Sequence, residues 1–245
     1  MKDKIIAKDS EELNQIAAKK FISIGRKAIE QNGKFTVALA GGSTPKSLYE
    51  LLTSEEFYSQ INWQKVFFFF GDERNVSIVS DESNFRMANE SILTPLQISP
   101  ENILRWETEL EDSEKTVRNY EKAIVDFFDL KENEFPRFDL ILLGMGDDGH
   151  TASLFPYSEG LKETKRIAVV NFVEKFDTNR FTFTFPTINN ASNVVFLING
   201  ANKANPLKEV LEGESQPEKF PSQNVKLKNG NLYWLIDAQA AQLLK

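Results

Sequence analysis

The chain has 245 residues, of which 41% are hydrophobic and 27% charged, a composition typical of a globular protein with ample length for a sizeable core. It contains no cysteine, which excludes disulfides, thiolate metal sites and thiol catalysis. The formal net charge of −7 argues against a nucleic-acid-binding protein, because such proteins usually carry a basic stripe.

The N-terminal segment, residues 1–9, lacks the apolar core of a signal peptide. No uninterrupted apolar stretch approaches the length that spans a membrane. We therefore expect a cytoplasmic protein with neither a membrane nor a nucleic acid as partner. Since the pattern reveals no exposed apolar patch, we also expect a monomer.

Strand-like and helix-like patterns alternate along almost the whole chain. A helix is predicted between the N-cap pattern at residues 9–12 and the Asn-Gly stop at residues 32–33, because apolar side chains recur at helical spacing between them. The remaining elements, in chain order, are a strand at 35–40, a helix through Leu48, Leu51 and Leu52, a strand at 66–70, helices at 84–93 and 114–128, strands at 138–143, 166–172, 181–185 and 194–198, a helix at 202–211, a strand at 232–236 and a helix at 238–244.

Apolar strands that alternate with amphipathic helices indicate the α/β class, with a doubly wound, mostly parallel sheet covered by helices on both faces. The four phenylalanines at residues 67–70 favour a core strand over a ligand pocket. Residues 212–223 are rich in Glu, Ser, Gln and Pro and are predicted to form a surface loop. Because the sequence shows no internal repeat, we expect one domain over residues 1–245.

The strand at 35–40 runs into the sequence GGSTP at residues 41–45. Gly41 and Gly42 allow a tight turn, and the Pro suits the first helical position. The free N–H groups at such a helix start attract phosphate, although an ordinary strand–helix turn explains the pattern equally well. The segment has neither the Gly-Lys-Ser/Thr of a Walker loop nor the dinucleotide-binding glycine pattern.

The strand at 66–70 ends in the sequence GDER at residues 71–74. Arg74 has the planar, fixed charge that pairs bidentately with a phosphate or a carboxylate. The alternative is a solvated charge cluster in which Arg74 neutralises Asp72 or Glu73.

The strand at 138–143 is followed by the sequence GMGDDGHT at residues 144–151. Its His150 is the sole histidine of the chain, and histidine is the one side chain that titrates near neutral pH without help. Asp147 and Asp148 are potential orienting carboxylates for the imidazole. A histidine that merely caps a helix or fills a turn is the alternative interpretation.

Parallel strands end at one edge of a sheet, where open α/β sheets bind their ligands, so the three turns are expected to face one cleft. We expect no metal site, because one histidine and no cysteine leave only carboxylates and no calcium-loop spacing is present. A Ser-His-Asp hydrolase is disfavoured, since the sequence contains no Gly-x-Ser-x-Gly elbow.

The motifs of the three turns resemble those of the 6-phosphogluconolactonase family. The related glucosamine-6-phosphate deaminases share the glycine–glycine–serine turn, the acidic strand end and the Asp-Gly-His. Their motif does not continue with the Ala-Ser-Leu-Phe-Pro found here at residues 152–156. The segments that carry the resemblance are 40–45, 70–74, 83–84, 144–156, 179–182, 200–204 and 234–237.

The resemblance implies a doubly wound fold shared with those deaminases and with ribose-5-phosphate isomerase. It also implies hydrolysis of 6-phosphoglucono-δ-lactone to 6-phosphogluconate, the second step of the oxidative pentose phosphate pathway, without a cofactor. Our hypothesis for this reaction makes neutral His150 the general base that activates water, with Asp148 or a backbone carbonyl setting its tautomer and Asp72 positioning the water or orienting the ring. The expected phosphate-binding residues are Gly41, Gly42, Ser43, Thr44, Arg74, Arg180 and Lys203.

Two alternatives remain open from the sequence. One is a sugar-phosphate deaminase or isomerase on the same fold, in which an acid such as Asp72 would move a proton between sugar carbons. The other is a non-catalytic sugar-phosphate sensor, which usually carries a DNA-binding module and a basic face that this sequence lacks.

Overall fold

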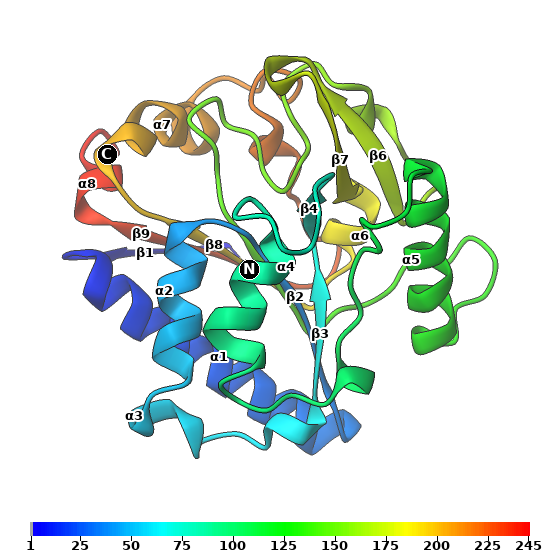
Figure 1. The fold of residues 1–245 in the computed structure, drawn as a ribbon. Coiled ribbons are helices and arrows are strands. Elements are labelled where there is room, and N and C mark those ends of the chain that lie inside the picture. Colours follow the sequence, from blue (N-terminus) through cyan, green and yellow to red (C-terminus); the bar gives the residue numbers. More distant parts are fainter. Residues whose placement is uncertain (1) are drawn as a thin grey trace.

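The computed structural model describes residues 2–245, whose path is drawn in Figure 1. In this part of the chain, six strands form one parallel sheet with the order β1-β9-β8-β5-β2-β3. The strands are β1 (Lys2–Ala7), β2 (Phe35–Leu39), β3 (Val66–Phe70), β5 (Leu140–Leu143), β8 (Asn193–Ile198) and β9 (Asn231–Asp237).

The strand order reverses beside β2. From β2 the chain moves to β3 at one edge, then returns to β5 on the other side and continues outward through β8 and β9. Because crossovers between parallel strands are right-handed, winding in two directions places helices on opposite faces of the sheet. The doubly wound α/β class is thus confirmed, with the point of reversal between β2 and β5.

The predicted helices are present in the predicted order, and two short α-helices, at 55–58 and 185–189, were not predicted. Figure 1 shows α1, α2 and α4 together on one face of the sheet. The helix predicted at 84–93 is present, but its second half, Asn89–Leu93, winds as a π-helix. The last helix ends earlier than the predicted residue 244. The helices are α1 (Ser10–Asn32), α2 (Ser43–Leu52), α3 (Glu55–Tyr58), α4 (Asn84–Ala88), α5 (Ser113–Phe128), α6 (Phe185–Asn189), α7 (Ala204–Glu212) and α8 (Ala238–Ala241).

The limits of α1 follow from its capping residues. Asp9 is the N-cap, and its carboxylate accepts the N–H of Glu12 at 2.9 Å. Gly33 closes the helix in the left-handed conformation, with φ of 76°, and donates its N–H to the carbonyl of Ile29. Both ends therefore lie where the sequence predicts them. No helix within residues 2–245 is long and apolar enough to cross a membrane.

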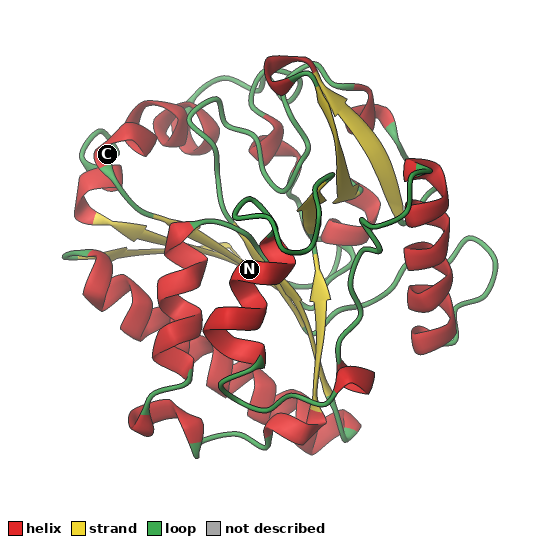
Figure 2. Ribbon diagram, viewed as in Figure 1, coloured by secondary structure: helices red, strands yellow, loops and turns green. Residues whose placement is uncertain are grey.

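A second, antiparallel sheet corrects the sequence-based topology. Three strands, in the order β4 (Asp72–Arg74), β7 (Thr178–Phe183) and β6 (Ala168–Val173), stand apart from the parallel sheet, as Figure 2 shows. The strands predicted at 166–172 and 181–185 exist, with shifted ends, but they do not join the parallel sheet. The short link between them permits a hairpin, whereas a parallel pair needs a crossover of a dozen or more residues.

Two further segments differ from the sequence-based expectation. Strand β1 was not predicted, because its sequence mixes Lys and Asp with Ile and forms no continuous apolar run. Such a mixed sequence suits a strand at the edge of a sheet, and β1 is an edge strand that pairs with β9 alone. The prediction of a surface loop at 212–223 is wrong for the end of this segment, where Phe220, Pro221 and Ser222 are buried.

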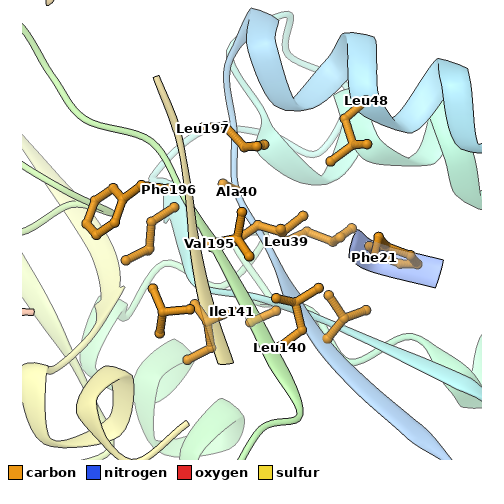
Figure 3. Packing of buried hydrophobic residues seen from close by; sticks show 14 of the residues in the cluster. Phe21, Leu39, Ala40, Leu48, Leu140, Ile141, Val195, Phe196 and Leu197 are labelled. Carbon is orange, nitrogen blue, oxygen red and sulfur yellow. The ribbon is translucent and has the colours of Figure 1, made fainter. Parts of the chain in front are cut away.

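The core centres on β2, in which each of the five residues is buried. Figure 3 shows Phe21 of α1, Leu48 of α2 and the side chains of β5 and β8 gathered around this strand. Phe69 of β3 packs edge-on against Phe138 with ring centroids 5.0 Å apart, so the phenylalanine run belongs to the core, as predicted. A tightly packed β5-β2-β3 layer holds the ends of these strands in fixed positions.

Candidate active site

A cleft of about 470 Å³ lies at the carboxyl ends of β2, β3 and β5. These strands are neighbours in the parallel sheet, so the three turns predicted to carry chemistry come together. The sequence-predicted residues that line the cleft are Gly41, Gly42, Asp72, Arg74, His150 and Lys203.

The imidazole of His150 has a defined partner on one ring nitrogen. Its Nδ1 lies 2.5 Å from Oδ1 of Asp148, and the same oxygen accepts the backbone N–H of His150 at 3.1 Å. The ring also stacks on Phe155, with centroids 4.0 Å apart. A carboxylate at Nδ1 requires the proton on that nitrogen, which leaves Nε2 of the neutral ring as the acceptor.

Asp148 is held in its charged form. Burial alone would raise the pKa of Asp148, yet the hydrogen bonds and charge of His150, together with Lys175, hold it well below the ordinary range for aspartate. The carboxylate is therefore an acceptor for Nδ1–H at any pH near neutrality, and it stabilises an imidazolium if one forms.

The loop that carries His150 is fixed by backbone bonds. Gly146 donates its N–H to the carbonyl of His150 at 2.9 Å. The carbonyl of Gly149 accepts both the N–H of Ser222 at 3.0 Å and its hydroxyl at 2.8 Å. The buried end of the segment predicted as a surface loop thus anchors the histidine loop.

Gly146→Ala is expected to abolish most activity while leaving the fold intact. A Cβ on Gly146 would overlap the imidazole of His150 and crowd the Asp148 carboxylate, so the ring must leave its position. Thermal unfolding and turnover measured on the same sample separate the two effects. Unchanged ¹⁵N shifts of the single histidine in the folded Gly146→Ala protein would contradict the crowding argument.

Asp72 forms part of the cleft wall but contacts a different partner. Its side chain is buried, and Oδ2 accepts the hydroxyl of Ser153 at 2.7 Å. Its backbone carbonyl accepts the side-chain amide of Asn84 at 3.0 Å. Of the two acids considered for orienting His150, Asp148 makes the contact with the ring, whereas Asp72 is held by Ser153.

Glu73, beside Asp72, ties β4 to the start of α4. Its buried carboxylate accepts the N–H groups of Asn84 at 2.8 Å and Phe85 at 2.7 Å, which places Asn84 in the cleft wall. Burial raises the pKa of Glu73, although these bonds act against the rise. The acid following Asp72 is therefore structural, and Arg74 does not neutralise it through its guanidinium, which instead donates to the carbonyl of Glu82.

The glycine turn after β2 presents the start of a helix to the cleft. Gly42 is the N-cap of α2 with φ of 102°, a conformation that favours glycine, and it has no side chain to cap the first-turn N–H groups. Ser43 lines an adjoining pocket of about 300 Å³ that shares Gly42 and Arg74 with the cleft. Thr44, the next residue of α2, is half-buried.

Two arginines face each other across the antiparallel sheet. Arg74 of β4 pairs in register with Arg180 of β7, and like charges directly opposite each other are destabilising. Burial lowers the pKa of Arg180, and the charge of Arg74 lowers it further. Within residues 2–245 the buried Nε of Arg180 has no hydrogen-bond partner, and Arg180 is not among the residues that line the cleft.

Lys203 enters the cleft half-buried from the turn after β8. Burial lowers its pKa, the carboxylates of Asp147 and Asp148 act against this, and the charge of Lys175 adds to it. Lys203 is thus a half-buried cation that, together with Lys175, balances the carboxylates of Asp147 and Asp148, rather than a fully solvated lysine.

The cleft wall also contains residues that were not among the predicted site residues, and Asn84, Lys175 and Phe176 are examples. Asn84 belongs to one of the motifs that carry the family resemblance. Lys175 and Phe176 come from the link between β6 and β7. The pairing of these two strands in the antiparallel sheet brings the link to the cleft, so the sequence of the link itself does not indicate a site.

Comparison with known proteins places the chain in a family. The family model for glucosamine-6-phosphate isomerases/6-phosphogluconolactonase matches residues 8–234. The chain is 42% identical to a 6-phosphogluconolactonase of Synechocystis sp. over 219 residues, which are 89% of this chain and 88% of that protein. Its fold matches the solved 6-phosphogluconolactonase of Trypanosoma brucei with a TM-score of 0.88 at 29% identity, covering 100% of this chain and 99% of the other. The 6-phosphogluconolactonase of Thermotoga maritima matches with a TM-score of 0.82 at 31% identity, covering 97% of this chain and 100% of the other. The chain belongs to the family of glucosamine-6-phosphate isomerases and 6-phosphogluconolactonases.

Proposed function

We propose that the chain hydrolyses 6-phosphoglucono-δ-lactone to 6-phosphogluconate, the second step of the oxidative pentose phosphate pathway. The observation that carries this proposal is one cleft that holds a His150–Asp148 pair together with Gly42, Arg74 and Lys203. Hydrolysis of a phosphorylated lactone requires a base to activate water and a group of cations and N–H donors to bind the phosphate. The name of the relative that is 42% identical supports the same activity.

The base is His150. Asp148 holds the proton on Nδ1, and Nε2 removes a proton from water as the water oxygen attacks the lactone carbonyl carbon. The tetrahedral oxyanion then collapses, the bond from that carbon to the ring oxygen breaks, and the imidazolium returns its proton to the ring oxygen. The same side chain thus takes a proton in the first step and returns it in the second, which is general acid–base catalysis.

The phosphate binds at the glycine turn. The proposed ligands are the N–H groups at the start of α2, following Gly42, and the charges of Arg74 and Lys203, since Gly42, Arg74 and Lys203 all line the cleft. Ser43 and Thr44 add first-turn donors, and Arg180 supports the site through its like-charged neighbour Arg74, since a bound dianion offsets their repulsion.

Asp72 positions the attacking water from the wall of the cleft. Ser153 bonds one of its carboxylate oxygens, and the residue lines the cleft, so the other oxygen is the proposed contact with the water. The N–H groups of the glycine-rich loop around Gly144 are the proposed donors to the oxyanion.

The motif at residues 152–156 supports a lactonase over a deaminase. Two of its side chains contact the two groups on which the chemistry depends, because Ser153 bonds Asp72 and Phe155 stacks on His150. This arrangement links the family-specific sequence to the orientation of the base.

The purified protein is the direct test of the proposal. We expect it to open 6-phosphoglucono-δ-lactone far above the spontaneous rate, measured by acid release in a pH-stat, and to release no ammonia from glucosamine 6-phosphate. Ammonia release without lactone opening would replace the proposal with a deaminase. Binding of both sugar phosphates without turnover of either would favour a sensor.

A further inference from the structure

Lys175 lies beside the catalytic pair without a role in the mechanism above. It comes from the turn Glu174–Phe176 that joins β6 to β7, so the antiparallel sheet delivers it to the parallel one. Its Nζ lies 3.6 Å from Oδ2 of Asp148 and 3.4 Å from Oδ1 of Asp147. The residue also lines the cleft.

The two oxygens of Asp148 have different partners. Oδ1 accepts from Nδ1 and from the backbone N–H of His150, while Oδ2 faces the ammonium of Lys175. A rotation that exchanged the two oxygens would break the contacts on both sides of the carboxylate. The carboxylate plane, and with it the imidazole plane, is therefore fixed from two sides.

The turn that carries Lys175 also packs against the aromatic rings beside His150. Phe176, next to Lys175, packs edge-on against Phe155 with centroids 5.8 Å apart, and Phe155 stacks on His150 at 4.0 Å. The ring of Phe176 also lies 5.4 Å from the guanidinium of Arg180. Lys175 thus stands on a turn whose next side chain, Phe176, packs against the ring that stacks on His150.

We propose that Lys175 is a positioning residue for His150, which acts by holding Asp148 in the orientation that keeps the proton on Nδ1. The kinetic part of this inference rests on the proposed lactonase activity. The charged groups around the pair are Asp72 of β4, Asp147 of the histidine loop, Lys175 and Lys203. The charge of Asp148 also acts on Lys203, but within residues 2–245 Lys175 is the only lysine that forms an ion pair with Asp148, so Lys175 is the lysine in contact with it.

The test compares Lys175→Met with Lys175→Arg and with Lys165→Met. Lys175→Met should lower kcat by about 2- to 5-fold with little change in KM, the size expected of a partly exposed ion pair. The difference in kcat between Lys175→Met and the wild type should shrink at high salt, because salt also screens the ion pair of the wild-type protein. Lys175→Arg should restore turnover. Lys165→Met removes one charge from another exposed lysine outside the cleft wall and should behave as wild type.

A second background separates positioning from substrate binding. In Asp148→Asn protein the charge through which Lys175 acts on His150 is gone, while its ion pair with Asp147 remains, so Lys175→Met should have no further effect on kcat. A rise in KM with unchanged kcat, or an undiminished effect in the Asp148→Asn background, would make Lys175 a substrate ligand and overturn the inference.

A measurement without substrate keeps this inference distinct from the proposed function. The chain has one histidine, so ¹⁵N resonances of labelled protein report the tautomer of His150 directly. Lys175→Met should increase the fraction of neutral rings protonated on Nε2. An unchanged fraction would overturn the positioning role even in a fully active enzyme, whereas an inactive wild type would overturn only the lactonase proposal.

Discussion

Replacing His150 by Gln is expected to lower kcat for lactone opening by about 10²- to 10⁴-fold, the usual contribution of a general base. Glutamine keeps a polar group of similar size against Phe155 but cannot take a proton from water. The substrate still meets Arg74 and Lys203, so KM should change far less than kcat. The measurement is a pH-stat assay with the spontaneous hydrolysis of the lactone subtracted.

The stability of the His150→Gln variant is the control for its loss of activity. The histidine ring is half-buried on a loop held by Gly149 and Ser222, neither of which depends on the imidazole. Thermal unfolding should therefore stay close to that of the wild type. Turnover near the wild-type value in a folded variant would remove His150 from the role of base.

Arg74→Ala is expected to weaken binding of 6-phosphogluconate by about 10- to 100-fold, as the loss of charged hydrogen bonds to a phosphate implies. The side chain lines both the cleft and the pocket beside Ser43, so it faces the start of α2 from across the glycine turn. Its removal also relieves the repulsion with Arg180. The stability of the fold should consequently change much less than the affinity.

Titration calorimetry with two ligands makes the Arg74 result specific. Gluconate lacks the phosphate, and its binding should be the same in Arg74→Ala and wild-type protein. Arg118→Ala is a charge-matched control, because Arg118 is exposed on α5 and pairs with Asp112. An unchanged affinity of Arg74→Ala for 6-phosphogluconate would remove Arg74 from the phosphate site.

The parallel half of the fold, apart from strand β1, was predictable because its signals are local. Buried strands such as residues 66–70 are continuous apolar runs, and capping patterns such as Asp9 with Gly33 mark helix ends. Parallel topology then brings the ends of β2, β3 and β5 together without further information. The monomeric state, the cytoplasmic location and the single-domain organisation stay predictions.

The antiparallel half was not predictable to the same degree. Strand β4 has three charged residues and is extended only because β7 pairs with it. Ser153 contacts Asp72 across 81 positions of sequence, and Lys175 reaches Asp148 through the pairing of a different sheet. Such contacts depend on tertiary structure, which a residue's own neighbours in sequence do not encode.

The central claim is that Asp148 holds the proton on Nδ1 of His150 and leaves Nε2 free to act as the base. The ¹⁵N chemical shifts of the single histidine, recorded in wild-type protein where the ring is neutral, test it directly. The distance of 2.5 Å between Nδ1 and Asp148 predicts a ring protonated on Nδ1 with a bare Nε2. A ring protonated mainly on Nε2 would contradict the claim.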